Sequence, residues 1–228
     1  MAGSRREFPL ITETSPKSPV TEAYRMLRTN IDFTNFDGDM RVIVISSAQK
    51  GEGKSTTAAN LAVTYAQTDK EVLLIDADLR RPALHRFFGL SNRTGLSTVL
   101  SRQQQLSETI LETAVDRLHL LPSGPTPPNP AEMLGSNHMA EVLAALKDRF
   151  DLIIVDTPPV LAVTDAALVA AKCDGVVLVA DSGQIKRDLA RKAKQALERS
   201  QARILGVVLN NVPRKNRDSY YYYYYGDS

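Results

Sequence analysis

The chain has 228 residues, of which 43% are hydrophobic, enough to form the core of one α/β domain. Its 28 Lys and Arg residues against 26 Asp and Glu residues give a formal net charge of +2, too weak to predict nucleic acid as a partner. The single cysteine, Cys173, excludes an intrachain disulfide, and His85, His119 and His138 lack the spacing of metal ligands.

Predicted helices and strands alternate along the chain. A first helix is expected over about residues 18–31, because Ser18 followed by Pro19 is typical of a helix start. After residue 40, five short and nearly continuous apolar segments indicate a parallel sheet covered on both faces, at residues 41–47, 71–76, 151–156, 175–180 and 204–212. Helical patterns lie between these strands, most clearly over residues 54–67, 138–150 and 184–200.

The stretch between the second and third of these strands is less regular. Another short strand is expected over residues 117–121, followed by a proline-rich loop. Asn129 is expected to cap the next helix, with Pro130 at its first position. The whole pattern predicts one doubly wound, mainly parallel α/β domain flanked by helices over residues 1–213, with residues 214–228 as a flexible, disordered tail.

No segment has the pattern of a secretory leader or a membrane span. Residues 1–19 lack a continuous apolar core. The most apolar later stretch, residues 160–180, is broken by Asp165, Lys172 and Asp174, which a bilayer core would penalise. We therefore expect a cytoplasmic protein that reaches the inner face of the membrane only through a partner.

A phosphate-binding loop is predicted at residues 48–56, AQKGEGKST, between a strand and a helix. Its glycines allow backbone N–H groups and the helix N-terminus to face phosphates. Lys54 would place a positive charge at the β- and γ-phosphates of ATP, and the Ser55 hydroxyl would bind Mg²⁺. The first position of the usual pattern is Ala48 instead of glycine. The predicted nucleotide-binding residues of the loop are Gly51, Glu52, Gly53, Lys54, Ser55 and Thr56.

Three acidic residues follow the ends of two predicted strands. Asp76 and Asp78 stand at the carboxyl end of the strand 71–76, and Asp156 ends the strand 151–156. Ligands of open α/β sheets bind beyond these strand ends, so the three carboxylates are expected to converge on the nucleotide and its metal. Alone, each could be an ordinary loop or cap residue. The nearby phosphate-binding loop favours the site.

The end of the chain is a homopolymer of tyrosine. It has no 2.0 or 3.6 period and therefore no face that could join a core. One interpretation is a low-complexity end without a role. The other is a cluster of phosphate acceptors, which requires a phosphate donor such as the predicted ATP site. The candidate acceptors are Tyr220, Tyr221, Tyr222, Tyr223, Tyr224 and Tyr225.

These features together resemble a known family. The sequences GEGKST, LLIDADLRRP at residues 73–82 and IIVDTPP at residues 153–159, with the terminal tyrosine cluster, are similar to the bacterial tyrosine kinases of capsule and exopolysaccharide synthesis, the CapB/CpsD family. The resemblance spans nearly the whole chain. It implies a P-loop NTPase fold of the MinD/ParA type and an ATP- and Mg²⁺-dependent kinase. Such an enzyme phosphorylates its own tail between subunits and regulates polysaccharide synthesis and export.

The resemblance also implies roles for individual residues. Lys54, Asp76 and Asp78 would be catalytic, with Asp76 orienting the attacking tyrosine or accepting its proton. The implied Mg²⁺ ligands are Ser55, Asp78 and Asp156. Asn210 and Asn211 resemble the position that contacts the base in related NTPases.

Assembly is the third implication of the family resemblance. Glu22, Arg25 and Arg28 share one broad face of the first predicted helix. Without context this pattern indicates a solvated face with one ion pair. In the family it lies between subunits of a ring, commonly an octamer, which we expect for the unphosphorylated form. A transmembrane modulator that activates the enzyme and protein substrates of polysaccharide synthesis are the other expected partners.

Two hypotheses compete with the kinase. One is a MinD/ParA-type ATPase switch with the tail as a docking peptide, and the other is a scaffold without turnover. MinD-type enzymes carry a second lysine five residues before the P-loop lysine. Here that position is Gln49, and Lys50 follows it.

The basic residues of the helix 184–200 indicate either a solvated face or docking of acidic substrates or a membrane-side partner.

Overall fold

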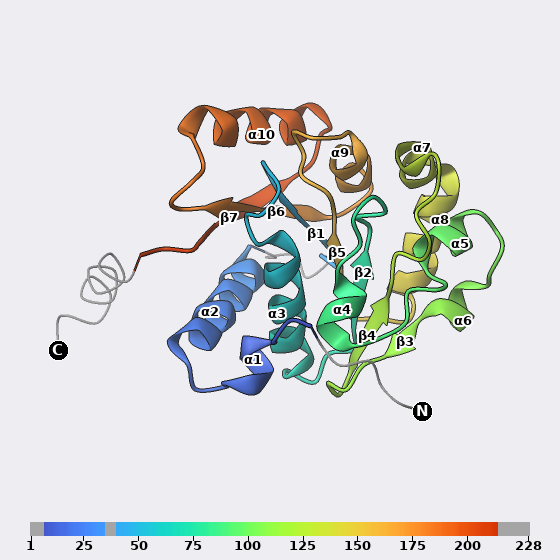
Figure 1. The fold of residues 1–228 in the computed structure, drawn as a ribbon, viewed down its shortest axis with the longest axis horizontal. Coiled ribbons are helices and arrows are strands. Elements are labelled where there is room, and N and C mark those ends of the chain that lie inside the picture. Colours follow the sequence, from blue (N-terminus) through green and yellow to red (C-terminus); the bar gives the residue numbers. More distant parts are fainter. Residues whose placement is uncertain (1–6, 35–39, 214–228) are drawn as a thin grey trace.

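The computed structural model describes residues 7–34 and 40–213 (Figure 1). The tyrosine cluster therefore lies outside the described residues. Within them, no helix combines the length and the apolar character needed to cross a bilayer.

A twisted sheet forms the centre of the domain. Its strand order is β3-β4-β2-β5-β1-β6-β7, and all neighbours are parallel except β3 and β4. The strands are β1 Val42–Ser47, β2 Val72–Asp76, β3 Leu111–Glu112, β4 Leu118–Leu121, β5 Leu152–Asp156, β6 Gly175–Asp181 and β7 Ile204–Asn210. The predicted mainly parallel α/β fold is confirmed.

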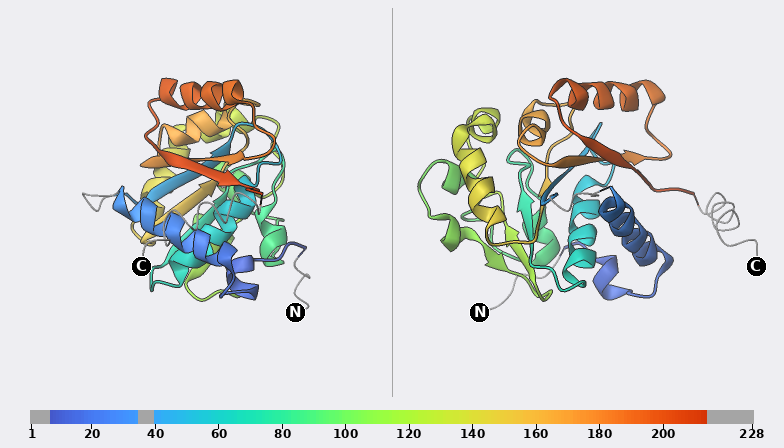
Figure 2. Two further views of the ribbon diagram at one scale, coloured as in Figure 1. Left: turned by 90° about the vertical axis from the view of Figure 1, so that its left-hand side faces the viewer. Right: turned by 180° about the vertical axis from the view of Figure 1, so that it is seen from behind.

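Helices cover both faces of the sheet (Figures 1 and 2). One core lies between the sheet and α2 Pro19–Phe33, α3 Lys54–Ala66 and α4 Leu84–Phe88, and the short helix α1 Ile11–Thr14 contacts α2 and α3. The other lies under α5 Leu96–Leu100, α6 Leu106–Thr109, α7 Pro130–Gly135, α8 Asn137–Lys147, α9 Asp165–Ala170 and α10 Arg187–Arg199. Burial on both faces explains why β1, β2, β5 and β6 are apolar almost throughout.

The edge strand β7 is different. Its side chains alternate between partly buried and exposed, and Val207 and Leu209 are 58% and 56% exposed. A groove of about 630 Å³ lies beside this strand, against α2, and includes Tyr24 and Leu27 from that helix. The fold therefore has one sheet edge with an apolar, accessible surface.

One predicted helix cap is confirmed in its position but not in its hydrogen bond. Asn129 does precede α7, but its side chain accepts no hydrogen bond from the first turn of the helix. Its amide Nδ2 instead donates to Glu132 Oε2 at 2.7 Å. Ser18, in contrast, caps α2 as its sequence indicates, because its Oγ accepts from the Thr21 N–H at 3.1 Å.

Asn60 holds the short helix α1 against α3. Its buried Oδ1 accepts from both the N–H and the hydroxyl of Thr12, at 3.1 and 2.9 Å, and its Nδ2 donates to the Thr56 carbonyl. We expect Asn60→Ala to lower the free energy of unfolding by about 1–3 kcal/mol, because two buried donors lose their acceptor. Chemical denaturation measures this. The exposed Asn30 offers a control, since Asn30→Ala should change stability by less than about 0.5 kcal/mol. Equal effects of the two substitutions would show that Asn60 has no special role.

Candidate active site

The loop between β1 and α3 has the backbone shape of a phosphate cradle. Gly51 and Gly53 have φ angles of 89° and 91°, in the left-handed region that favours glycine. A Cβ on Gly53 would lie 2.1 Å from Asn210 Nδ2, whereas the position of a Cβ on Gly51 is open. The loop ends at the first turn of α3, whose N-terminus points its free N–H groups toward the same space.

Two side chains support this loop from within. Glu52 is 4% exposed, and its carboxylate accepts from the Gln49 N–H at 2.6 Å. Asn210, at the end of β7, donates from Nδ2 to the Glu52 carbonyl at 3.0 Å. Asn211 donates instead to Asp181 Oδ2 at 2.8 Å. The structure thus places Glu52 and Asn210 at the loop, with side chains that hold its backbone.

An ammonium group and three carboxylates meet beyond the strand ends. Lys54 Nζ lies 3.0 Å from Asp78 Oδ2 and 3.4 Å from both carboxylate oxygens of Asp156. The Ser55 hydroxyl donates to Asp156 Oδ2 at 2.5 Å. The cluster is local because β2 and β5 pair in register, with Asp76 opposite Asp156. The structure therefore brings together five predicted site residues, Lys54, Ser55, Asp76, Asp78 and Asp156.

Asp76, like Asp156, is an enclosed acid of this cluster. It is fully buried, and its Oδ2 accepts from the Ala83 and Leu84 N–H groups at 2.9 and 3.0 Å. Its Oδ1 accepts from the Asp78 N–H at 3.2 Å. Burial, and then the negative charge of Asp156, raise the pKa of Asp76 to about 7. A carboxyl with this pKa can take up a proton near neutral pH.

The pKa values of Asp156 and Lys54 are also shifted by burial and by the charges around them. Burial also raises the pKa of Asp156, against the opposing effects of Lys54 and Ser55. For Lys54, desolvation lowers the pKa, but the charges of Asp156 and Asp78 outweigh it and raise the pKa overall. Lys54 therefore remains a cation in the site.

The residues present fit ATP and Mg²⁺. The loop offers backbone N–H groups and the Lys54 cation to phosphate oxygens. Ser55, Asp78 and Asp156 contribute a hydroxyl and two carboxylates, the hard oxygen ligands that Mg²⁺ prefers. The negative charges outnumber the single ammonium, so a divalent cation would balance the cluster.

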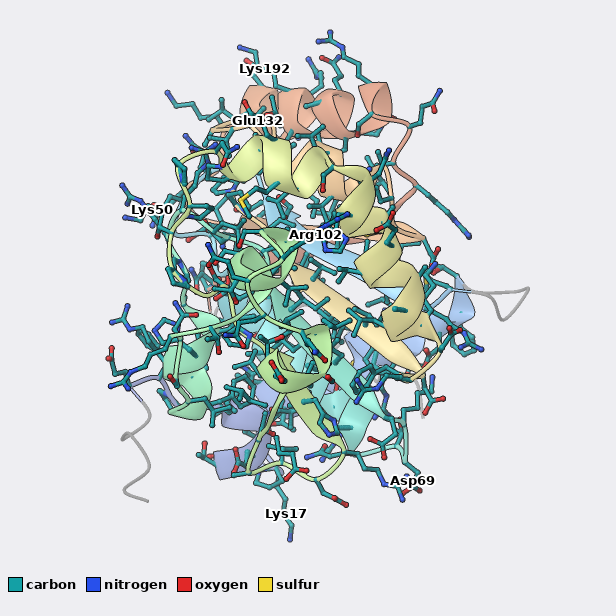
Figure 3. All side chains as sticks on the ribbon, turned by 90° about the vertical axis from the view of Figure 1, so that its right-hand side faces the viewer. Lys17, Lys50, Asp69, Arg102, Glu132 and Lys192 are labelled. Atoms are coloured by element: carbon teal, nitrogen blue, oxygen red, sulfur yellow. The ribbon has the colours of Figure 1, made fainter. Side chains whose placement is uncertain are left out.

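An ion pair beside the site did not emerge from the sequence. Arg80 donates from Nε and Nη2 to the two oxygens of Asp165, at 2.9 and 3.1 Å, and the Asp165 side chain is fully buried. This bidentate pair fixes the loop after β2 to the start of α9. Two features of the sequence could have indicated this pair: the adjacent arginines of LRRP, residues 79–82, and Asp165 at the start of a helix. Lys50, in contrast, is exposed on the surface of the P-loop (Figure 3).

The three residues of the predicted interface have different surroundings. Arg25 Nη1 lies 3.1 Å from Glu22 Oε2, the intrahelical ion pair that the spacing indicates. Arg28 donates from Nη1 to the Thr64 carbonyl at 2.6 Å, so it also joins α2 to the last turn of α3. Arg28 thus has a role within the chain.

Comparisons with known proteins place this geometry in one family. A family model described as an AAA domain matches residues 40–188. The tyrosine-protein kinase YwqD of Bacillus subtilis is 45% identical over 96% of this chain and 92% of its own length. The putative tyrosine-protein kinase CapB of Staphylococcus aureus is 40% identical over 96% of both chains. The chain belongs to the bacterial tyrosine-protein kinase family.

Solved structures agree with this assignment. The chimerical protein CapA2B2 has a TM-score of 0.87 and 42% identity, over 93% of this kinase and 94% of that chain. The cell division ATPase MinD of Pyrococcus furiosus has a TM-score of 0.65 at 27% identity, over 79% of the kinase and 78% of that chain. The predicted MinD-like P-loop fold and the predicted kinase class are therefore confirmed.

The charge cluster makes the stability of the free kinase dependent on Lys54. We expect Lys54→Met to lower the free energy of unfolding by about 3 kcal/mol or more at about pH 8, because it leaves buried carboxylates without their cation. The pKa of Asp76 and that of Asp156 are raised in the folded state, so the folded chain gains protons relative to the unfolded chain as the pH falls below about 7. Lys54 itself lowers both pKa values, so without this cation the carboxyls bind protons still more readily and the variant gains more stability than the unmodified chain as the pH falls. The loss should therefore shrink toward about pH 5.5.

Denaturation at several pH values, without nucleotide or metal, measures this effect. Lys17→Met is the matched control, because Lys17 is exposed, and it should shift stability by less than about 0.5 kcal/mol. A Lys54→Met penalty that is constant between about pH 5.5 and pH 8 would contradict the assigned ionisation of the cluster.

Proposed function

We propose that this kinase transfers the γ-phosphoryl group of ATP to the tyrosines of its own C-terminal cluster, Tyr220 to Tyr225, in a Mg²⁺-dependent reaction. Phosphorylation would regulate capsular or exopolysaccharide synthesis and export. The observation that carries the proposal is the position of Lys54 between Asp78 and Asp156, next to buried Asp76, at the mouth of a glycine cradle. Tyrosine-kinase relatives over nearly the whole chain support the acceptor.

Lys54 and the loop would act on the phosphates. The Lys54 ammonium and the backbone N–H groups of the cradle stabilise negative charge on the transferring group. Ser55, Asp78 and Asp156 would hold Mg²⁺, which when bound would neutralise phosphate charge. Arg80 would keep the Asp78 loop in place through its pair with Asp165. The site is thus assembled before the acceptor arrives.

Asp76 would manage the acceptor proton. The new bond joins the tyrosine oxygen to the γ-phosphorus as the bond to ADP breaks, and the phenol proton passes to Asp76. A pKa of about 7 suits a base that accepts a proton at neutral pH and releases it afterwards. The three backbone N–H groups that bind Asp76 keep its carboxylate oriented.

Partners are part of the proposal. A transmembrane modulator would bring the kinase to the inner face of the membrane and activate it. The similarity to the chimera CapA2B2, whose name pairs a CapB component with a CapA component, supports such a partner. The apolar groove between α2 and β7 offers a surface for it, because Asn210 both lines this groove and holds the P-loop. Protein substrates of polysaccharide synthesis would be further acceptors.

Labelling with radioactive ATP tests the reaction. We expect label on the tail tyrosines, at a low rate from the isolated chain and faster with the modulator. Lys54→Met and Asp76→Asn should each reduce the rate by about 10²-fold or more, because each removes a charge contact at the reacting groups. Lys17→Met and Asp116→Asn, at exposed positions, are matched controls with rates near that of the unmodified chain.

The alternatives give different products in the same experiment. Label released only as phosphate, with none on tyrosine, would indicate an ATPase switch of the MinD type. No turnover with the modulator present would indicate a scaffold. Normal labelling of Lys54→Met or Asp76→Asn would refute the role given to that residue.

We further propose that the unphosphorylated kinase forms a ring, an octamer in the simplest case, through Glu22, Arg25 and Arg28. Each phosphotyrosine adds about −1.5 to −2 charges, so six would add about −9 to −12 to a chain with a formal charge of +2. Repulsion between tails should shift the ring toward monomers, most strongly at low salt.

Light scattering on the unphosphorylated and the phosphorylated kinase measures the mass of the assembly. Arg25→Ala should dissociate the unphosphorylated ring with little change in unfolding free energy, because its ion pair with Glu22 is exposed. Arg28→Ala should change both quantities, since it also loses the bond to Thr64. A mass that stays constant across both variants and both phosphorylation states would rule out this control of assembly.

A further inference from the structure

Helix α10 has a strongly basic outer face. Ala193 and Leu197 are buried against the sheet, so the opposite side of the helix faces solvent. We define the basic face of α10 by six exposed residues of the helix and its N-cap: Lys186, Arg187, Arg191, Lys192, Lys194 and Arg199. Only two acidic residues share the helix, Asp188 and Glu198. With these two acids counted, residues 186–199 have a net charge of about +4.

Most of these cations have no acid to pair with. Arg191 lies 3.7 Å from Asp188, and Lys194 is paired with Glu198, both at exposed positions. Within the described part of the chain, four form no ion pair: Lys186, Arg187, Lys192 and Arg199. Lys192 projects outward from the helix (Figure 3). Such a cluster is complementary to an anionic partner.

The described chain ends next to the start of this helix. Strands β6 and β7 are parallel neighbours, so both leave the sheet at the same edge. Beyond β6, the Ser182 N–H donates to the Asn210 carbonyl at 2.9 Å. Beyond β7, Asn211 adopts a left-handed φ of 55° and donates to Asp181. The last described residues, 211–213, and the loop into α10, residues 182–186, therefore lie side by side (Figure 2, right).

The tail is long enough to follow α10. Residues 214–219 separate Pro213 from the first tyrosine and span up to about 20 Å when extended. The 13 residues of α10 measure about 20 Å. The tyrosine cluster can thus reach any part of the basic face of its own chain.

Only phosphorylation makes the tail complementary to this face. The unmodified segment 214–228 contains three basic and two acidic residues, Arg214, Lys215, Arg217, Asp218 and Asp227. Its charge therefore does not attract it to a basic helix. Two phosphotyrosines already add about −3 to −4 charges, and guanidinium and ammonium groups bind phosphate through charge-assisted hydrogen bonds.

We propose that the basic face of α10 is the docking site for the phosphorylated tyrosine tail of the same chain. This inference rests on the proposed function, because it requires phosphate on the tail. The tether gives the tail a local concentration in the millimolar range, so a weak intrinsic affinity is enough. Docking removes modified tyrosines from the acidic catalytic cluster and from neighbouring subunits. Unmodified tyrosines are not held and stay available as acceptors.

A synthetic peptide tests the docking independently of kinase activity. The peptide comprises residues 218–228 with Tyr221, Tyr223 and Tyr225 phosphorylated chemically, and fluorescence anisotropy reports its binding to the dephosphorylated full-length chain. We expect binding that weakens with added salt, and no binding of the unphosphorylated peptide. The triple variant Lys186→Gln/Arg187→Gln/Arg191→Gln should weaken binding by about tenfold or more.

A matched variant separates a specific face from net charge. Neutralising three exposed arginines elsewhere, Arg93→Gln/Arg102→Gln/Arg149→Gln, removes the same charge and should change the affinity by less than about twofold. Equal weakening by both triple variants would overturn the proposal in favour of non-specific attraction. Binding that the α10 variant leaves intact would place the phosphopeptide elsewhere, such as the active site, and also overturn it. The proposal would also be overturned if the chain bound phosphatidylglycerol vesicles through α10 and did not bind the phosphopeptide.

Because phosphate is introduced by synthesis, a kinase that fails to label its tail leaves this measurement unaffected. The two proposals can therefore fail separately.

Discussion

One cation among three buried carboxylates is the constraint on which the site depends. Lys54 lies 3.0 Å from Asp78 and 3.4 Å from Asp156, while Asp76 sits opposite Asp156 in the adjacent strand. Burial of several acids is unfavourable unless cations or N–H donors compensate them. The protein supplies one ammonium and the N–H groups around Asp76. The remaining negative charge makes the site complementary to a divalent metal ion.

The regular part of the fold could be predicted because its physical cause is local. Strands β1, β2, β5 and β6 are buried on both faces and must therefore be apolar throughout, a pattern visible in any window of the sequence. The elements that were not predicted from the sequence are too short to show a hydrophobic period. Strand β3 has two residues, and α1, α4, α5, α6 and α9 have four to six. Asn129 stands at the N-cap position of α7 as expected, but its side chain makes no capping bond, and its Nδ2 donates to Glu132.

In the candidate site, too, the features with a local cause in the sequence could be predicted and the others could not. The positions of Lys54 and Asp156 follow from a loop motif and from the rule that parallel strands end at one edge. The contacts that hold these residues join distant parts of the sequence. Asn210 and Glu52 are 158 residues apart, and Arg80 and Asp165 are 85 apart. No local pattern predicts such contacts, because they depend on which strands and loops become neighbours in the folded chain.

Asn210 links the chemistry to the edge of the sheet. Its side chain holds the P-loop backbone, its carbonyl accepts from the loop that leads into α10, and the tail begins a few residues later. Among the described residues its strand, β7, pairs only with β6 and leaves Val207 and Leu209 exposed. An edge strand with few buried side chains is the part of a sheet that moves most easily. A partner that covers this edge would therefore stiffen the support of the P-loop without touching the nucleotide.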